Sequence, residues 1–360
     1  MIFPGFSKTS RVWCVLTAFV CLGLSVDMAS AQSATATSAT PKKTTTKKTI
    51  TRKSTTSRVS TTSASATRRS RTRSRAAAQA RALREAQEPR FRLDDSGALV
   101  PDVRAEAAII YDSATGHVLW ETNSQNQRSI ASITKVMTAV VFMEDSPNLS
   151  DEIVVQSSDV RAASTTYIRA GYRITKGDLL HLTLIASDNA AARALARVSS
   201  LGSEAFIARM NSKAAELGLT NTSYADPSGL LSANVSSAYD MAKLITYVSG
   251  DERIASVMRT QTYAVTAGRR VINIHSTNQL VMNGDVDVQA GKTGFITKSG
   301  YCLATLLRLP QGGPEVAVVV LGAKSNAGRF WETRHLFNWF ASKAEDLLGT
   351  PLQAATATAN

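Results

Sequence analysis

Short apolar runs typical of β-strands lie at both ends of the globular part of this sequence, and helical patterns fill the stretch between them. Near the start, residues 105–111 and 117–121 predict a hairpin, because the turn-forming sequence Asp-Ser-Ala-Thr-Gly separates them. The later strands are expected at residues 261–266, 270–275, 286–297, 301–309 and 315–321. Strands from both ends predict an α/β (α+β) fold: one mostly antiparallel sheet flanked by helices, with a helical middle.

Helices are expected from Ser132 onward. The apolar run after Ser132 predicts one helix, and a final amphipathic helix is expected near the C-terminus. The remaining helices are expected at residues 179–186, 190–198, 203–217, 236–248 and 330–348.

The first 31 residues have the three-part layout of a secretory signal. Lys8 and Arg11 precede an apolar stretch too short for a comfortable membrane span, and Ala29-Ser30-Ala31 fits a cleavage site. We therefore expect export to the periplasm or cell envelope, with the protein soluble or peripherally attached; an uncleaved anchor is the alternative. Cleavage leaves Cys302 as the one cysteine, so no intrachain disulfide can form.

A basic segment rich in Ser, Thr, Ala, Lys and Arg, residues 32–95, follows the signal. It is poor in large apolar side chains and is expected to be a disordered tail. Residues 42–84 hold five lysines, nine arginines and no acidic residue, so the chain's net charge of +13 belongs to the tail. Anionic envelope polymers or lipid head groups are its expected partners, with a plain tether as the alternative. Export argues against a specific nucleic-acid partner.

The folded domain is expected over residues 96–348, with a flexible C-terminus over residues 349–360. Its first candidate for chemistry is Ser132-Ile133-Thr134-Lys135, the only Ser-x-x-Lys in the chain. A helix that begins at or just before Ser132 places the hydroxyl and the amine one turn apart on one face. A serine must lose its proton to a base as it attacks, and a partly buried lysine near another cation can be that base. The ordinary alternative is a polar helix start.

Two further motifs favour the catalytic interpretation of Ser132 and Lys135. Ser187-Asp188-Asn189 lies at a predicted helix junction, and Lys292-Thr293-Gly294 lies on a predicted strand. Each alone has an ordinary explanation as a helix cap or a strand with a glycine. Their order and placement are those required by the serine acyl-transfer enzymes of the penicillin-recognising superfamily.

The chain resembles low-molecular-mass penicillin-binding proteins, the D-alanyl-D-alanine carboxypeptidase and endopeptidase family, over about residues 100–340. Besides the three motifs, Asp226-Pro227-Ser228-Gly229-Leu230 and residues 299–303 are similar to the family's signatures. Residues 275–281 resemble the endopeptidase branch. The resemblance implies a β-lactamase/transpeptidase-like sheet flanked by helices, with the active site at the edge of the sheet.

The resemblance also implies a role for each motif residue. Ser132 would attack a D-alanyl carbonyl of a peptidoglycan stem peptide, and Lys135 would take its proton; β-lactams would be covalent inhibitors of the same serine. Ser187 would relay a proton to the leaving amine, and Asn189 would hold the substrate amide. The remaining implied site residues are Lys292 and Thr293, which would meet a substrate carboxylate, Gly294, and Phe295, whose N–H would join that of Ser132 in an oxyanion hole. Lys135 and Lys292 would each lower the pKa of the other.

The expected reaction is cleavage of the D-alanyl cross-link by a DD-endopeptidase. The family's major carboxypeptidases carry a further β-rich domain and an amphipathic anchor, whereas a short Ala/Thr-rich end follows the last helix here. Trimming of the terminal D-alanine is the alternative, and a non-catalytic wall-binding protein is a second one.

Other hydrolase classes have no matching pattern. The four histidines lack metal-ligand spacing, so neither a metal nor another cofactor is expected. The sequence contains no glycine-flanked serine elbow of a Ser-His-Asp enzyme, and no matching Glu-x-x-x-Asn in the helical middle supplies the deacylating glutamate of a class A β-lactamase. Cys302, in an apolar strand, is expected to be a buried core residue.

Overall fold

The structure is a computed structural model that describes residues 74, 77, 80–81, 84 and 87–348 of the 360-residue chain. The predicted signal peptide, most of the basic tail and residues 349–360 lie outside the described residues. Among the described residues, no helix combines the length and the apolar character needed to cross a membrane.

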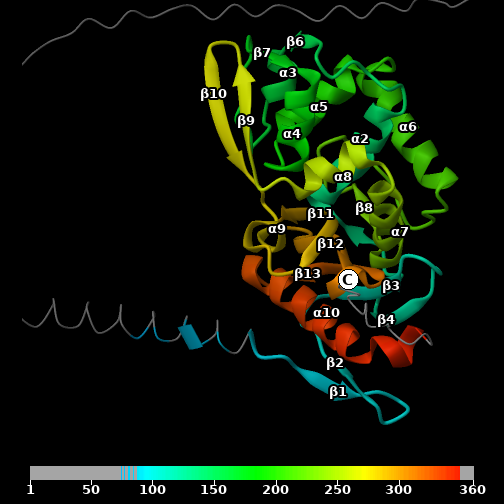
Figure 1. Ribbon diagram of the computed structural model, residues 1–360. Coiled ribbons are helices and arrows are strands. Elements are labelled where there is room, and N and C mark those ends of the chain that lie inside the picture. Colours follow the sequence, from blue (N-terminus) through cyan, green and yellow to red (C-terminus); the bar gives the residue numbers. More distant parts are fainter. Residues whose placement is uncertain (1–73, 75–76, 78–79, 82–83, 85–86, 349–360) are drawn as a thin grey trace, which may run out of the picture. The chain divides into compact units, whose positions relative to one another are not determined.

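A five-stranded antiparallel sheet occupies the centre of the fold (Figure 1). Its order is β11-β12-β13-β3-β4. The strands are β3 (Ala107–Asp112), β4 (Val118–Thr122), β11 (Asp287–Ile296), β12 (Gly300–Arg308) and β13 (Glu315–Ala323). Because β13 pairs with β3, the last strand of the domain closes against one of the first. The predicted sheet built from both ends is confirmed.

Helices cover both faces of this sheet. α7 (Ala238–Ser249) packs on one face, and α10 (Asn326–Leu348) packs on the other. Successive strand residues point to opposite faces, so Ile109 joins the core on the α7 side while Ile110 joins the core under α10. This double burial explains why β3 and β13 read as continuous apolar runs.

The helical middle of the chain is built around α2 (Thr134–Met143), whose ten residues are all buried. A helix that is apolar on every side must lie inside the fold, and α2 packs against α4, α5, α6 and α7. The other helices are α3 (Ser157–Val160), α4 (Lys176–Leu184), α5 (Asn189–Val198), α6 (Gly202–Glu216), α8 (Glu252–Arg259) and α9 (Gln279–Asn283).

Four two-stranded pairs complete the described part. β9 (Thr262–Ala267) and β10 (Arg270–His275) form a separate hairpin instead of joining the main sheet. Figure 1 shows this hairpin projecting beside the helical middle, and the Tyr263 ring stacks on His181 of α4 at 3.8 Å. The other pairs are β1 (Phe91–Leu93) with β2 (Leu99–Pro101), β5 (Arg128–Ser129) with β8 (Val235–Ser236), and β6 (Glu152–Val154) with β7 (Arg173–Thr175).

The folded part begins before residue 96, so the predicted end of the tail at residue 95 is too late. Asp94 closes the β1–β2 turn by accepting the backbone N–H groups of Ser96 and Ala98 at 2.9 Å each. The Phe91 ring packs edge-on against His335 of α10, with ring centroids 4.9 Å apart. Packing on a distant helix orders β1, and local composition does not reveal such a contact.

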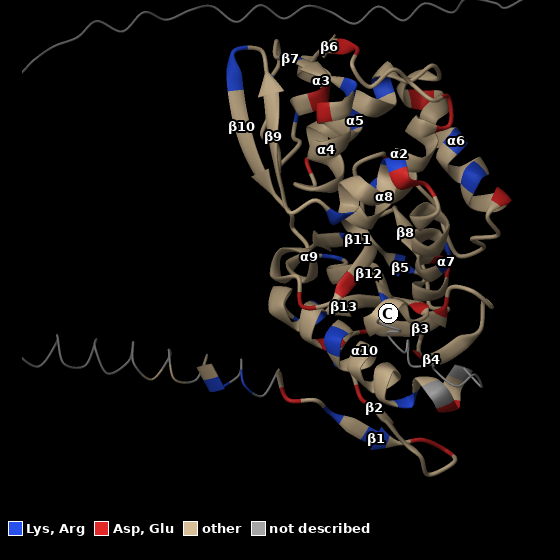
Figure 2. Ribbon diagram, viewed as in Figure 1, with Lys and Arg blue, Asp and Glu red and all other residues tan. Residues whose placement is uncertain are grey.

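Charged side chains are common on the outer helices, as α6 illustrates (Figure 2). Arg209 of α6, for example, pairs with Glu144 at 2.7 Å on the surface. Two lysines depart from this pattern: Lys135 is 0% exposed and Lys292 is 1% exposed. Burial of a charged amine is costly, so both lysines mark a candidate site.

Candidate active site

Ser132 lies in a single turn of 3-10 helix, η1 (Ala131–Ile133), that leads directly into α2. The prediction of a helix start near Ser132 is confirmed, although the first turn is tighter than an α-helix. Ala131 has a positive φ of 48°, an unfavourable conformation for a residue with a side chain. Gly229 allows this turn, because a Cβ on Gly229 would collide with the carbonyl oxygen of Ala131.

The Lys135 amine lies beneath Ser132 and donates hydrogen bonds to three acceptors. These are Ser132 Oγ at 2.9 Å, Asn189 Oδ1 at 2.6 Å and the backbone oxygen of Ser228. Three acceptors for three N–H groups fix the amine in one position.

Burial lowers the pKa of Lys135 from 10.5 to about 7. The carboxylates of Asp226 and Asp188 oppose this shift, and the guanidinium of Arg193 adds to it. Arg193 is therefore a cation near Lys135 that the sequence analysis did not predict. An amine with this pKa is neutral in a large fraction of molecules near neutral pH.

The second lysine joins the second and third motifs. Lys292 Nζ donates to Ser187 Oγ at 2.8 Å and to the backbone oxygen of Thr293 at 3.1 Å. Burial lowers the pKa of Lys292 well below its usual value, and the nearby Lys135 and Arg329 lower it further. The predicted effect of Lys135 on Lys292 is thus confirmed.

The second motif also fastens a neighbouring loop. Asp188 caps α5 by accepting the Ala191 N–H at 2.9 Å, and it accepts the Tyr167 N–H at 2.6 Å. Asn189 donates its side-chain N–H to the Ala163 oxygen at 2.7 Å. The loop after α3 is therefore held as one wall of the site by Asp188 and by Asn189, which also contacts Lys135.

The edge strand β11 meets the turn that carries Ser132 at Gly294. A Cβ on Gly294 would lie 2.5 Å from the Ile130 oxygen and 3.3 Å from the Ser132 nitrogen. Only glycine permits this approach. The next residue, Phe295, is 48% exposed, and its ring stacks on Tyr301 with centroids 4.2 Å apart.

A cavity of about 430 Å³ lies where these elements meet. Every predicted site residue except the two lysines lines it, and the lysines reach the lining through their hydrogen bonds to Ser132 and Ser187. The lining consists of Ser132, Ser164, Thr165, Ala186, Ser187, Asn189, Leu230, Thr277, Thr293, Gly294, Phe295, Ile296, Thr297 and Arg329. The structure therefore brings the three motifs to one place.

Sequence analysis did not predict Arg329 as a residue of the site. Arg329 of α10 is 6% exposed and donates to the backbone oxygens of Gly294 at 3.0 Å and Cys302 at 3.2 Å. No local pattern marks it, because it lies on a helix far from the motifs in sequence. Cys302 itself is buried in the core, as predicted.

The signature that begins at Asp226 has a structural task that its sequence did not reveal. The Asp226 carboxylate accepts the N–H groups of Ser228 at 3.1 Å, Gly229 at 3.2 Å and Leu231 at 3.2 Å. It thereby shapes the loop whose Ser228 carbonyl receives the Lys135 amine.

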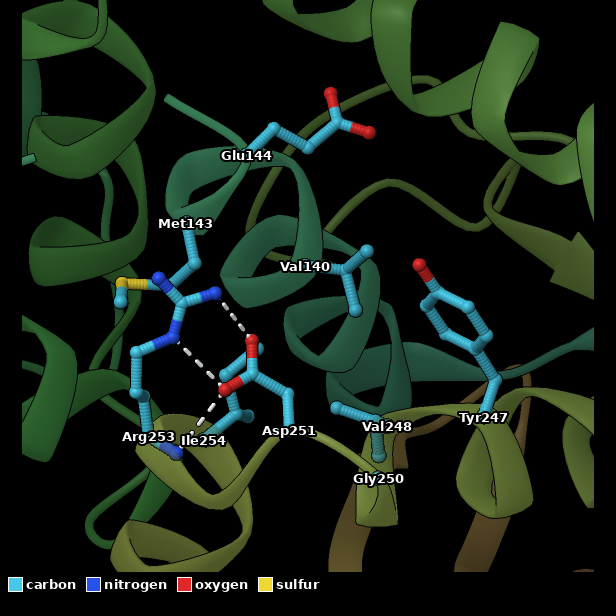
Figure 3. Close-up of a pocket in the computed structure, with 9 residues that line it drawn as sticks. All are labelled: Val140, Met143, Glu144, Tyr247, Val248, Gly250, Asp251, Arg253 and Ile254. Atoms are coloured by element: carbon cyan, nitrogen blue, oxygen red, sulfur yellow. Dashed lines mark hydrogen bonds and ion pairs between the residues drawn. The ribbon is translucent and has the colours of Figure 1, made fainter. Parts of the chain in front are cut away.

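Another cavity, of about 360 Å³, lies between the end of α2 and the helices α7 and α8 (Figure 3). Its charged lining residues are Glu144, Asp251 and Arg253, and Arg253 is paired with Asp251 at 2.6 Å. It shares no residue with the Ser132 cavity. Among the described residues, no group of three His, Cys, Asp or Glu side chains could hold a metal ion.

A serine whose hydroxyl touches a buried, partly neutral lysine belongs to the class of serine hydrolases that use an amine as the general base. A family model described as D-alanyl-D-alanine carboxypeptidase matches residues 95–325. The chain belongs to this family of serine DD-peptidases, which are penicillin-binding hydrolases.

Relatives and solved structures agree with this membership. A D-alanyl-D-alanine endopeptidase of Haemophilus influenzae is 33% identical over 242 residues, which are 67% of this chain and 83% of that protein. Its counterpart in Escherichia coli is 32% identical over 243 residues, 66% of this chain and 78% of that one. A variant of the Streptomyces K15 DD-transpeptidase is 27% identical with a TM-score of 0.62, covering 67% of this chain and 98% of that one.

Proposed function

We propose that this protein is an exported DD-endopeptidase that cleaves the D-alanyl cross-link between peptidoglycan stem peptides through an acyl-enzyme on Ser132. The observation that carries the proposal is the Lys135 amine, which is buried, lies 2.9 Å from Ser132 Oγ and has a pKa of about 7. Relatives named endopeptidases, at 32% and 33% identity, support the preference for cross-links. The carboxypeptidase reaction is the alternative, since it uses the same residues.

Acylation begins when neutral Lys135 takes the Ser132 proton as Oγ attacks the D-alanyl carbonyl. The new C–O bond forms while the carbonyl oxygen gains negative charge. The backbone N–H groups of Ser132 and Phe295 stabilise this oxyanion, and the loss of one such donor costs about 10²–10³ in rate.

The amide bond then breaks, and the leaving amine needs a proton. Ser187, hydrogen-bonded to Lys292 at 2.8 Å, gives its proton to the amine and regains one from the lysine. Asn189 holds the substrate amide, and Thr293 meets the carboxylate beside the leaving nitrogen. Water then attacks the ester carbonyl and passes its proton through Ser187 to Lys292. Lys135 returns its proton to Ser132 as the stem peptide leaves.

Covalent labelling tests the nucleophile. A fluorescent penicillin is expected to label the purified protein, and Ser132→Ala is expected to abolish the label. The exposed Ser232 provides a matched control, because Ser232→Ala removes the same hydroxyl from a surface position. Persistent labelling of Ser132→Ala would show that Ser132 is not the nucleophile.

Digestion of purified cross-linked muropeptides tests the reaction, with product masses as the readout. Conversion of dimers to monomers without prior release of D-alanine is expected. Release of free D-alanine with the dimers left intact would instead establish the carboxypeptidase.

Export and the basic tail form a separate part of the proposal. Residues 1–31 act as a cleaved signal, and the tail of residues 32–90 attaches the enzyme to anionic envelope polymers or lipid head groups. Mass spectrometry of the protein from its native envelope fraction is expected to find Gln32 as the N-terminus. A chain that keeps residues 1–31 and stays in the cytoplasm would refute the proposed export.

A further inference from the structure

Thr277 lines the Ser132 cavity, and the mechanism above gives it no task. It lies in the short connection between β10, which ends at His275, and α9, which begins at Gln279. Its hydroxyl oxygen is 2.7 Å from the hydroxyl oxygen of Thr293. Its backbone N–H donates to the oxygen of Ile185 at 3.1 Å, just before the second motif. Thr277 is therefore tied to the edge of the sheet and to the helical middle at once.

The contact between the two hydroxyls has two possible directions. Each hydroxyl carries one hydrogen, so only one of the pair can donate to the other. When Thr293 donates to Thr277, the oxygen lone pairs of Thr293 are left for the cavity and repel a carboxylate. When Thr277 donates, the hydrogen of Thr293 is free to point at a carboxylate in the cavity. The second direction is the one that binds an anion.

We propose that Thr277 is a positioning residue that directs the Thr293 hydroxyl hydrogen toward the carboxylate beside the scissile nitrogen of the substrate. The inference rests on the proposed function, because it takes a D-alanyl peptide with that carboxylate as the substrate. A donated hydrogen bond also polarises Thr293 and strengthens the bond that it makes to the anion.

Removal of the Thr277 hydroxyl leaves the backbone in place. The bond to Ile185 uses the main-chain N–H, and valine has nearly the shape of threonine. In Thr277→Val the Thr293 hydroxyl loses the partner that orients it. Thr277→Ser keeps a hydroxyl at the same position and serves as the matched control.

The experiment compares two synthetic peptides that carry the D-alanyl cross-link bond and differ only in the group beside the scissile nitrogen, one a free carboxylate and the other a carboxamide. The readout is the ratio of kcat/KM for the acid to kcat/KM for the amide. Wild type is expected to favour the acid. Thr277→Val is expected to lose about tenfold of that preference, the effect of one hydrogen bond to a charged group, while Thr277→Ser retains it. Thr293→Val is expected to lose the preference too, with little added by the second substitution.

Each other outcome has a distinct meaning. An unchanged acid-to-amide ratio in Thr277→Val overturns the inference and leaves the proposed function standing. Equal slowing of both peptides overturns it as well, because that result reports a structural role. If the wild-type enzyme cleaves neither peptide, the proposed function fails and the role of Thr277 falls with it.

Discussion

Acylation of Ser132 is expected to slow below about pH 7, because Lys135 must be neutral to accept the serine proton. Burial lowers the pKa of Lys135 from 10.5 to about 7. One pKa unit corresponds to about 1.4 kcal/mol, so the site favours the neutral amine by about 5 kcal/mol. At pH 7 half of the Lys135 side chains are then neutral, against roughly one in 3,000 for an unshifted lysine.

The assay is the second-order rate constant for labelling by a fluorescent penicillin, measured from pH 5 to 9 at constant ionic strength. We expect a plateau on the alkaline side and a tenfold fall per pH unit below a midpoint near 7. Lys135→Arg is the informative variant, because arginine keeps a cation of similar length that does not lose its proton in this range. Its rate on the plateau is expected to be about 10²–10⁴-fold lower, the usual contribution of a general base.

Two results would refute this reasoning. A midpoint above pH 9 would mean that burial does not shift the pKa of Lys135. A Lys135→Arg enzyme that labels at the wild-type rate would mean that another group accepts the proton of Ser132.

Two further predictions concern close packing and linkage. Gly294→Ala is expected to reduce labelling about 10²–10³-fold, because its Cβ would lie 3.3 Å from the Ser132 nitrogen and push the oxyanion donor away. Gly250→Ala, at a φ of −73° and with no contact under 3.4 Å, is the control and is expected to label normally. The lowered pKa of Lys135 means that the unfolded chain binds more protons between about pH 7 and 10.5, so the free energy of unfolding is expected to rise with pH across that window. Urea midpoints at pH 7 and 9 are expected to show a smaller rise in Lys135→Met; an equal rise would contradict the assignment.

Much of the fold could be predicted from the sequence, because strand periodicity and apolar helices are local signals. The strands from both ends and the three motifs are examples. The meeting of the motifs depends on tertiary contacts, namely the approach of Gly294 to the Ser132 turn and the bond from Lys292 to Ser187. The place of the β9–β10 hairpin could not be predicted. Its sequence indicates two strands, but only the stack of Tyr263 on His181 shows that it packs on the helices.

The parts of the site that sequence reasoning missed share a physical cause. The Ser228 acceptor for Lys135 is a backbone oxygen. Every residue type carries one, so the residue type at position 228 does not predict this contact. Arg329 acts on the backbone of β11 and β12 from a helix far along the chain. Thr277 is identified as a site residue only by the contact of its hydroxyl oxygen with that of Thr293 at 2.7 Å.

The site concentrates features that are unfavourable one at a time. Ala131 and Ser187 both have positive φ values, 48° and 60°, and such conformations persist only where the surrounding structure enforces them. Lys135 and Lys292 are buried amines whose charged forms the fold penalises. The compensation comes from the cores on both faces of the sheet, which hold β11 against the Ser132 turn. Substitutions that loosen this contact are therefore expected to relax the strained turn and rehydrate the lysines, so acylation is lost while most of the fold persists.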